Sequence, residues 1–342
     1  MAACTGNITK FWMGLLVHQI TAGKYSAVHW NWKSYTQIVM AIIGIVGNSL
    51  VICVYLRKLR FHIATNTLIL NLAVADLLGS IFIIPLPKVT QIGEGPFSEI
   101  YCSLAWSGVL LWIAIVASIY TLTMLSVERY LAVIYPIKYR LLFVGARPKI
   151  VIISIWILSA FVNLYITFVA KNSNGICIVK WPNPAFQAIF GVFLFLAEFF
   201  IPMLIMLVSH VRTIFSLRTQ AETILRSGSA RNSPSMALLR TRRKVIETLF
   251  VVVVTFIICW LPDQLAYMLY NIGVLETEYL STHLYEFFVL LAFLNSCVNP
   301  IIYTFKNKEF RHSLKVLLRV RKRNQIHATN DNPIVDIRST AK

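Results

Sequence analysis

The chain has 342 residues, of which 57% are hydrophobic and only 13% are charged. A soluble domain carries about 25% charged residues, and the mean hydropathy of +0.69 also disfavours an ordinary soluble enzyme. The net charge of +18 would suit a nucleic-acid-binding protein, but the basic residues are concentrated in alternate loops, as the positive-inside rule predicts for membrane proteins. We therefore expect a polytopic membrane protein without a nucleic-acid partner.

Seven apolar segments follow one another along the chain. They cover 35–57, 65–90, 100–134, 147–170, 184–217, 240–272 and 281–305. Each is long enough for a helix that crosses the hydrocarbon core, which takes about 20 residues. Helices are expected because backbone groups in lipid must be satisfied within the segment, whereas barrel strands would be shorter and strictly alternating. The fold class is therefore an all-α membrane protein, a seven-transmembrane helix bundle.

The distribution of lysine and arginine orients this bundle. These residues crowd the loops after the first, third and fifth segments and the chain after residue 305, whereas the opposite side carries few. The N-terminus is then extracellular and the C-terminus cytoplasmic, in a multi-pass plasma-membrane protein. Asn7 begins a glycosylation sequon on the predicted outer side.

The chain outside the membrane divides into distinct regions. We expect an extracellular N-terminus over 1–34, the bundle over 35–305, a short amphipathic cytoplasmic helix over 306–320 and a disordered tail over 321–342. The polar, serine-containing stretch 219–235 is interpreted as a flexible cytoplasmic loop.

Asp76 lies in the middle of the second segment, where an unpaired carboxylate is costly. Polar residues at comparable depth in other segments are its candidate partners: Asn48, Ser118, Asn295, Ser296 and Asn299. One interpretation is a structural polar cluster that ties the helices together. The other is a sodium or proton site that biases an equilibrium between two states.

Glu128 and Arg129 stand at the inner mouth of the third segment. An arginine that snorkels near a helix end is common, but an acid directly before it is less so. Adjacent side chains do not face each other on a helix, although long charged groups can meet by bending. We hypothesise a latch in which Glu128 holds Arg129 until a partner takes it.

Prolines interrupt three of the segments. Pro262 follows Trp260 inside the sixth segment, and Pro202 and Pro300 lie inside the fifth and the seventh. Proline removes a backbone hydrogen bond and kinks a helix, so one end of the helix can swing. Packing alone is the alternative reason for such kinks.

Two of the six cysteines, Cys102 and Cys177, lie at the level of the outer loops. The outer side of a membrane is oxidising, so we expect a disulfide between them. Six cysteines are too few for a disulfide scaffold.

Taken in order, these motifs resemble those of the rhodopsin-like, class A G-protein-coupled receptors, and the match covers about 30–320. The matching residues are Gly47-Asn48, Leu72 to Asp76, Cys102, Glu128-Arg129-Tyr130, Trp156, Pro202, Cys259-Trp260-Leu261-Pro262, Asn299-Pro300-Ile301-Ile302-Tyr303 and Phe310.

The resemblance implies roles for three further groups of residues. Sodium, the only bound ion that we expect, would lie at Asp76 with Ser118, Asn295 and Asn299. Residues that transmit activation below the ligand pocket would be Ile119, Pro202, Phe256 and Pro262. G-protein coupling would involve Glu128, Arg129, Tyr130, Pro136, Ile137, His210 and Tyr303. His210 departs from the family, which has at that position a tyrosine that steadies the arginine in the active state.

The ligand pocket implied by the resemblance contains aromatic, aliphatic and acidic residues: Gln91, Leu111, Trp112, Ile115, Glu198, Trp260, Asp263, Tyr267 and Tyr285, with Glu286 at its upper rim. Glu198 and Asp263 could pair with an arginine or a lysine of the ligand. The alternative is hydrogen bonding between helices, to Gln264 or Tyr267.

The class of ligand follows partly by exclusion. The chain lacks the seventh-helix lysine of opsins and the third-helix aspartate of amine receptors, since it has Phe293 and Leu111 there. The seventh helix looks most like that of neuropeptide receptors of the galanin, neuropeptide Y and tachykinin type, so we expect an extracellular peptide. A constitutively active receptor and a receptor for a non-peptide small molecule are the alternatives. The implied partners are a heterotrimeric G protein, arrestin, a receptor kinase and membrane lipid.

Overall fold

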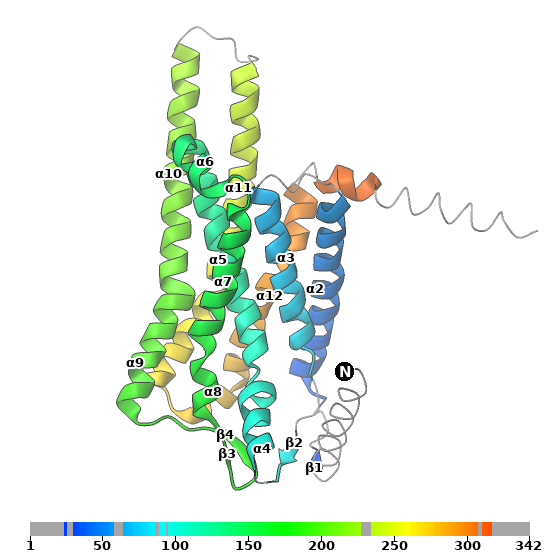
Figure 1. Ribbon diagram of the computed structural model, residues 1–342, viewed down its shortest axis with the longest axis vertical. Coiled ribbons are helices and arrows are strands. Elements are labelled where there is room, and N and C mark those ends of the chain that lie inside the picture. The colour runs from blue at the N-terminus through cyan, green and yellow to red at the C-terminus, as the bar shows by residue number, and fades with distance from the viewer. Residues whose placement is uncertain are drawn as a thin grey trace, which may run out of the picture.

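The computed structural model describes residues 24–25, 30–57, 64–85, 89–93, 95–226, 234–306 and 310–316. Within these ranges the chain is a bundle of long helices that run along one axis (Figure 1). Among the described residues, seven helices are long and apolar enough to cross a membrane. The fold class expected from the seven apolar segments is therefore confirmed.

The helices of the bundle follow in chain order. They are α2 (Trp32–Arg57), α3 (Ala64–Phe82), α5 (Val109–Ile134), α7 (Arg147–Asn163), α10 (Ile201–Arg226), α11 (Pro234–Asn271) and α12 (His283–Lys306). Shorter elements extend three of these spans: α4 (Pro96–Ile100) and the π-helix η1 (Tyr101–Trp106) precede α5, α8 (Tyr165–Val169) follows α7, and α9 (Pro184–Leu194) and the π-helix η2 (Phe195–Phe200) precede α10. The 3₁₀-helix η3 (Thr277–Ser281) leads into α12.

The central helix of the bundle is α5. It packs against α3, α7 and α10 and also touches α11. Six consecutive residues, from Ala114 to Ile119, are buried. Since successive residues of a helix point in all directions around it, the whole circumference of α5 is covered at this depth.

The apolar segment 100–134 predicted one continuous helix, but the third span is divided into separate helices. The π-helix η1 ends at Trp106, and Gly108, with φ of 67°, stands between it and α5. Only glycine adopts this left-handed conformation readily, so it allows the chain to restart as a second helix. The top of the span is therefore a separate short unit that carries Cys102.

Three helix boundaries also differ from the prediction. The second span ends at Phe82 rather than near residue 90, just before Pro85. α10 runs to Arg226 and α11 begins at Pro234, so most of the predicted loop 219–235 is helical and projects beyond the bundle (Figure 1). Four buried apolar side chains hold these extensions together: Leu217, Met236, Leu239 and Ile246. The polar composition of the stretch concealed this contact.

The segment after α5 is also helical, where a loop was expected. Helix α6 covers Pro136–Phe143, with Pro136 in its first turn. Proline suits that position because the missing N–H has no partner there in any case. Phe143 is buried and belongs to the main core, the large cluster of buried apolar side chains that includes Leu68, Leu122 and Phe256. It therefore anchors α6 to the bundle.

Two pairs of short strands lie at the opposite end. Strand β1 (Lys24–Tyr25) pairs with β2 (Val89–Gln91), and β3 (Ala170–Ser173) pairs with β4 (Ile176–Val179) as an antiparallel hairpin. The hairpin turn is formed by Asn174 and Gly175, both with positive φ, as the favoured two-residue turns require. A Cβ atom at Gly175 would lie 2.7 Å from the carbonyl oxygen of Ile92, so glycine also permits a close approach to the segment after β2.

The helix expected after the bundle is described from Phe310 to Val316. Phe310 is 3% exposed, and its ring stacks on Tyr55 of α2 at 6.4 Å between centroids. This contact fastens the helix against the bundle. The rest of 306–320, the tail 321–342 and Asn7 with its sequon lie outside the described residues.

Candidate functional site

At the end of the bundle where α5 meets α6, Glu128 and Arg129 form an ion pair. Arg129 donates from Nε to Glu128 Oε2 at 2.6 Å and from Nη2 to Oε1 at 3.0 Å. This two-pronged geometry is the strongest arrangement for arginine and a carboxylate. The contact that the latch hypothesis requires is therefore present. We refer to this end as the arginine end.

Two residues that sequence reasoning missed complete this site. Thr65 on α3 donates from Oγ1 to Glu128 Oε1 at 2.8 Å, and the carboxylate has no exposed surface. Tyr139 on α6 lies close by: its partial burial, followed by the charge of Glu128, raises the pKa of its phenol. No motif in the sequence signals either contact, since both depend on how α3 and α6 pack against α5.

The other residues expected at the arginine end are arranged differently. His210 is buried, and its Nε2 lies 3.1 Å from Ser126 Oγ rather than against Arg129. Tyr130 packs edge-on against Tyr135 at 5.8 Å between ring centroids. Pro136 and Ile137 lie on the exposed side of α6, with Ile137 78% exposed. The side chain of Tyr303 lies outside the described part of the chain.

In the middle of the bundle, Asp76 accepts hydrogen bonds from Ser118 and Asn299, and Ser296 also lies within hydrogen-bonding reach of it. Ser118 Oγ donates to Oδ1 at 2.7 Å, and Asn299 Nδ2 donates to Oδ2 at 2.8 Å. Asp76 is 1% exposed. Asn295, also expected here, lies one turn before Asn299, and its buried Oδ1 has no hydrogen-bond partner. The cluster thus joins α3, α5 and α12 and leaves one acceptor oxygen unused.

Beside this cluster lies an apolar layer that contains the residues expected to transmit activation. Ile119 and Phe256 are buried in the main core. Phe256 packs against Phe199 with 5.8 Å between ring centroids, a contact that the sequence analysis did not anticipate although Phe199 lies three residues before Pro202. The π-helix η2 ends two residues before Pro202, which cannot donate a backbone hydrogen bond. Pro262 lies inside α11.

Closer to the other end, the structure brings expected pocket residues of α5 and α11 near one another. Leu111 and Trp112 pack against the main core, and Ile115 and Trp260 are buried in it. The ring of Trp112 lies 6.4 Å from that of Phe293 on α12. The side chain of Gln91 falls outside the described part of the chain, although its backbone pairs with Lys24.

Two acids are buried among these residues. Glu198 on η2 is 7% exposed and Asp263 on α11 is 3% exposed. The π-helix η2 packs against α11, so the two acids lie on neighbouring elements of the bundle. Tyr285 of α12 lies against Asp263, and Tyr267 lies beside Tyr165 and Asn271. Of the partners suggested by the sequence for the two acids, Tyr267 lies in the surroundings of Glu198, and hydrogen bonding to Gln264 stays a prediction.

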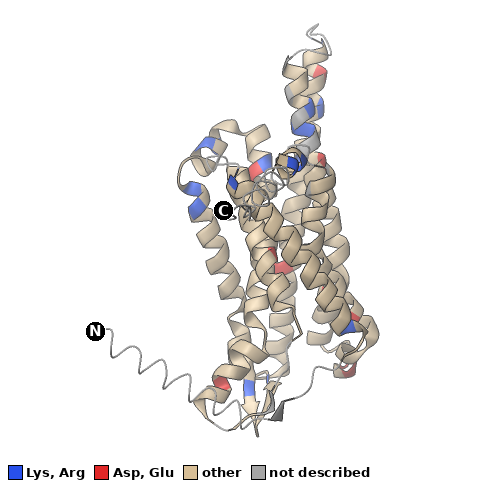
Figure 2. Cartoon of the chain, turned by 90° about the vertical axis from the view of Figure 1, so that its right-hand side faces the viewer, with Lys and Arg blue, Asp and Glu red and all other residues tan. Residues whose placement is uncertain are grey.

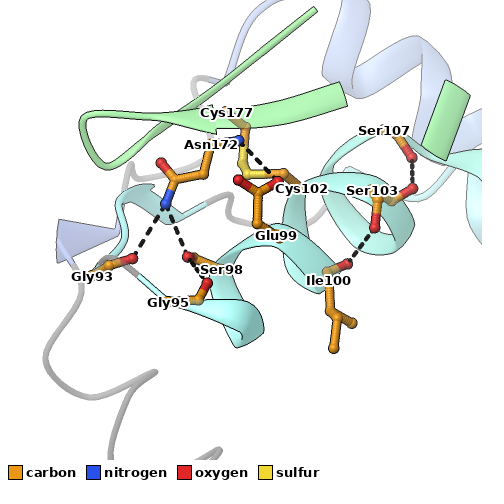
Figure 3. Close-up of a disulfide and its surroundings, with 10 residues drawn as sticks. All are labelled: Gly93, Gly95, Ser98, Glu99, Ile100, Cys102, Ser103, Ser107, Asn172 and Cys177. Atoms are coloured by element: carbon orange, nitrogen blue, oxygen red, sulfur yellow. Dashed lines mark hydrogen bonds between the residues drawn. A yellow bond between two sulfur atoms is a disulfide. The ribbon is translucent and has the colours of Figure 1, made fainter. Parts of the chain in front are cut away.

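The expected disulfide joins Cys102 of η1 to Cys177 of β4. Figure 3 shows how polar contacts support it: Asn172 donates from Nδ2 to Ser98 Oγ at 2.9 Å and from its backbone N to Glu99 Oε2 at 3.4 Å. The hairpin β3–β4 is thereby fastened to the top of the third span. We call this the disulfide end.

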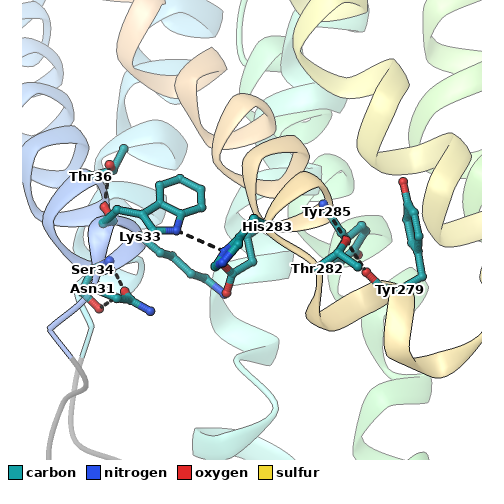
Figure 4. Close-up of polar contacts among 10 residues, drawn as sticks. Asn31, Lys33, Ser34, Thr36, Tyr279, Thr282, His283 and Tyr285 are labelled. Atoms are coloured by element: carbon teal, nitrogen blue, oxygen red, sulfur yellow. Dashed lines mark hydrogen bonds and ion pairs between the residues drawn. The ribbon is translucent and has the colours of Figure 1, made fainter.

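Also at the disulfide end, the first turns of α2 and α12 are clasped together (Figure 4). Lys33 Nζ lies 3.2 Å from Glu286 Oε1, and His283 Nδ1 lies 3.4 Å from Glu286 Oε2. Trp32 donates from Nε1 to His283 Nδ1 at 3.4 Å. Glu286, expected at the rim of the pocket, takes part in this contact between two helices.

Charged residues distinguish the two ends of the bundle. Lysines and arginines gather mostly at the arginine end, whereas acidic residues are few and include one in the middle of the bundle (Figure 2). Within the described residues, no group of three or more histidine, cysteine and acidic residues is placed to hold a metal ion.

Comparisons with known proteins agree with this arrangement. The sequence profile of the 7 transmembrane receptor (rhodopsin family) matches residues 47–303. Somatostatin receptor type 5 of Bos taurus is 34% identical over 292 residues, which cover 83% of this chain and 75% of the relative. Somatostatin receptor type 1 of Rattus norvegicus is 34% identical over 298 residues (83% and 71%), and type 4 of the same species is 31% identical over 293 residues (82% and 71%).

Proposed function

Because the chain belongs to the rhodopsin family of seven-transmembrane receptors, we propose that it is a cell-surface receptor that is activated by an extracellular peptide and signals through a heterotrimeric G protein. Members of this family are receptors rather than enzymes. Its relatives named as somatostatin receptors support a peptide ligand.

The ion pair between Glu128 and Arg129 is the observation that carries the coupling mechanism. A ligand shifts an equilibrium only if it binds one state better than the other. We expect the agonist to favour a state in which α11 has swung outward about Pro262, which opens the arginine end. Arg129 then leaves Glu128 and contacts the G protein, which binds beside Tyr130, Pro136, Ile137 and Tyr303.

The proposed orientation rests on the distribution of charge. Basic residues at the arginine end suit the cytoplasmic side of a plasma membrane, and a disulfide suits the outer, oxidising side. The N-terminus is then extracellular. The helix described from Phe310 to Val316 would rest on lipid at the inner surface. Arrestin and a receptor kinase would bind at the arginine end, once it has opened.

The polar cluster around Asp76 fits a bound sodium ion as an allosteric regulator. Sodium prefers oxygen ligands, and the carboxylate, the Ser118 hydroxyl and the unused Asn295 Oδ1 offer them. Asn299 would hold the carboxylate in place. Ion binding would stabilise the closed state of the bundle, in which these side chains lie together.

The test measures G-protein dissociation in cells that express the chain, with a set of G-protein biosensors and a peptide library. We expect activation by one or more peptides, and its loss in Arg129→Ala at equal surface density, with Arg212→Ala as the matched control on α10. If Arg129→Ala activates normally, the coupling role is wrong. A high basal signal that no peptide changes would identify a constitutively active receptor, and a response only to small molecules would replace the peptide.

A further inference from the structure

The acid pair formed by Glu198 and Asp263 is the least compensated polar feature of the bundle. Within the described part of the chain, neither carboxylate takes part in an ion pair, and the buried Oδ1 of Asp263 has no hydrogen-bond partner. Buried charges are normally paired or hydrogen-bonded, because removing an isolated carboxylate from water is costly. The pair therefore lacks a cation.

A second observation points to a ligand along α11. Buried side-chain atoms without a partner occur at three positions of this helix: Trp260 Nε1, Asp263 Oδ1 and Asn271 Oδ1. Each of these residues is 3% exposed. They span three helical turns, about 16 Å. Native structures leave few such atoms unpaired, so Trp260 Nε1 and Asp263 Oδ1 are available to a polar ligand, whereas Asn271 already packs against Gly191 of α9.

The surroundings of the acid pair are aromatic. Tyr120 donates from its hydroxyl group to the backbone carbonyl of Ala197, the residue before Glu198, at 3.3 Å. Tyr285 lies against Asp263. Aromatic rings attract cations over their faces, and arginine stacks on them more readily than lysine does. A cation held here would therefore be enclosed by acids and rings together.

We infer that the ligand presents a guanidinium group, as in an arginine side chain, which bridges Glu198 and Asp263. A guanidinium has five N–H donors in one plane and can serve two carboxylates on different helices, whereas an ammonium acts as a point charge. The bridge connects η2 to α11 at Asp263, the residue after the proposed pivot at Pro262. This inference rests on the proposed function, since it names the chemistry of the receptor's ligand.

The test is a binding measurement on the purified receptor with three small probes: the Nα-acetyl amides of arginine, lysine and citrulline. Citrulline has nearly the shape of arginine but no charge. At one fixed ligand concentration, the ligand that binds more tightly raises the temperature of unfolding more. We expect the arginine probe to raise it most, the lysine probe less, and the citrulline probe not at all.

Variants locate the site. Glu198→Gln and Asp263→Asn should each lower affinity for the arginine probe about tenfold or more, because each removes a charge-assisted hydrogen bond. The double variant should lose less than the sum of the two, since one guanidinium serves both acids. Glu198→Asp, which keeps the charge, should retain the preference for arginine and guards against a folding defect. Glu247→Gln, whose exposed carboxylate pairs with Arg243 near the arginine end of α11, is the matched control.

Three outcomes would overturn the inference: equal stabilisation by citrulline, equal stabilisation by lysine with sensitivity to only one acid, or full arginine binding in both single variants. None of these results depends on G-protein activation. A receptor that signals in response to peptides but does not bind the arginine probe would refute the guanidinium site alone. A receptor that never activates a G protein would refute the proposed function.

Discussion

The two ends of the bundle are held together by different means. At the disulfide end, a covalent bond and the contacts of Asn172 fix the hairpin to the third span. At the arginine end, the principal polar contact is the ion pair of Glu128 and Arg129, both on one helix. An ion pair can exchange partners, whereas a disulfide cannot do so under oxidising conditions. One end is thus preorganised to receive a ligand, and the other is free to rearrange.

The largest expected effect comes from breaking the fixed end. Cys102→Ser combined with Cys177→Ser opens a link between residues 75 positions apart. The loop-entropy relation gives a loss of about 4 kcal/mol of stability, and the hairpin should become accessible to protease. Thermal unfolding and limited proteolysis of the purified receptor measure both. Equal protease resistance in the double variant would show that Asn172 suffices to hold the hairpin.

The middle of the bundle gives the next largest effect. Asp76→Ala removes the acceptor for both Ser118 and Asn299, and leaving a buried donor unpaired costs about 1–3 kcal/mol each. Glu198→Gln, by contrast, removes a carboxylate without such partners and should leave stability unchanged or higher. Unfolding temperatures of the two variants test this contrast. A similar loss in both would mean that Glu198 has a structural partner.

At the arginine end, Glu128→Gln weakens the ion pair and should raise basal G-protein activation several-fold, with a loss of about 1–2 kcal/mol in stability. Thr65→Val removes only one hydrogen bond to the same carboxylate and should raise basal activity less. Biosensor signals at matched surface density compare them. Unchanged basal activity in Glu128→Gln would mean that the ion pair does not restrain the receptor.

The smallest effect is expected at the clasp between α2 and α12. Glu286→Gln breaks a partly exposed ion pair with Lys33, and such pairs contribute about 0.2–1 kcal/mol. The unfolding temperature of the variant should lie slightly below that of the unchanged receptor. The difference should shrink at high salt, because salt screens exposed charges. Lys33→Met should produce the same small change. A larger loss would show that the clasp supports the disulfide end together with the covalent bond.

Features that depend on one segment could be predicted from the sequence. The seven spans followed from apolar length, and the disulfide followed from two cysteines at one level of the membrane. The meeting of Glu128 and Arg129 was also foreseen, because adjacent long side chains need no tertiary structure to touch. The turn at Asn174-Gly175 is a strong hairpin signal that could have revealed β3 and β4.

Features that depend on packing between distant segments could not be predicted. Thr65 and Tyr139 meet Glu128 only because α3 and α6 pack against α5. The helical extension of α10 is held by side chains of α11, beyond a stretch whose polar composition indicates a loop. Likewise, the sequence placed Glu198 and Asp263 in the outer half of the bundle, but only the structure shows that they lie on neighbouring elements and, among the described residues, have no ion-pair partner.

The length of α11 makes it a lever. Pro262 lies 28 residues from the start of the helix at Pro234, since 262 minus 234 is 28. At 1.5 Å per residue this arm is about 42 Å long, so one degree of rotation at the proline moves its far end by about 0.7 Å. Asp263 is the next residue along. A bond between the ligand and Asp263 therefore acts almost at the fulcrum. A rotation of a few degrees there barely moves the ligand's contacts, but it moves the far end of the helix by several ångströms.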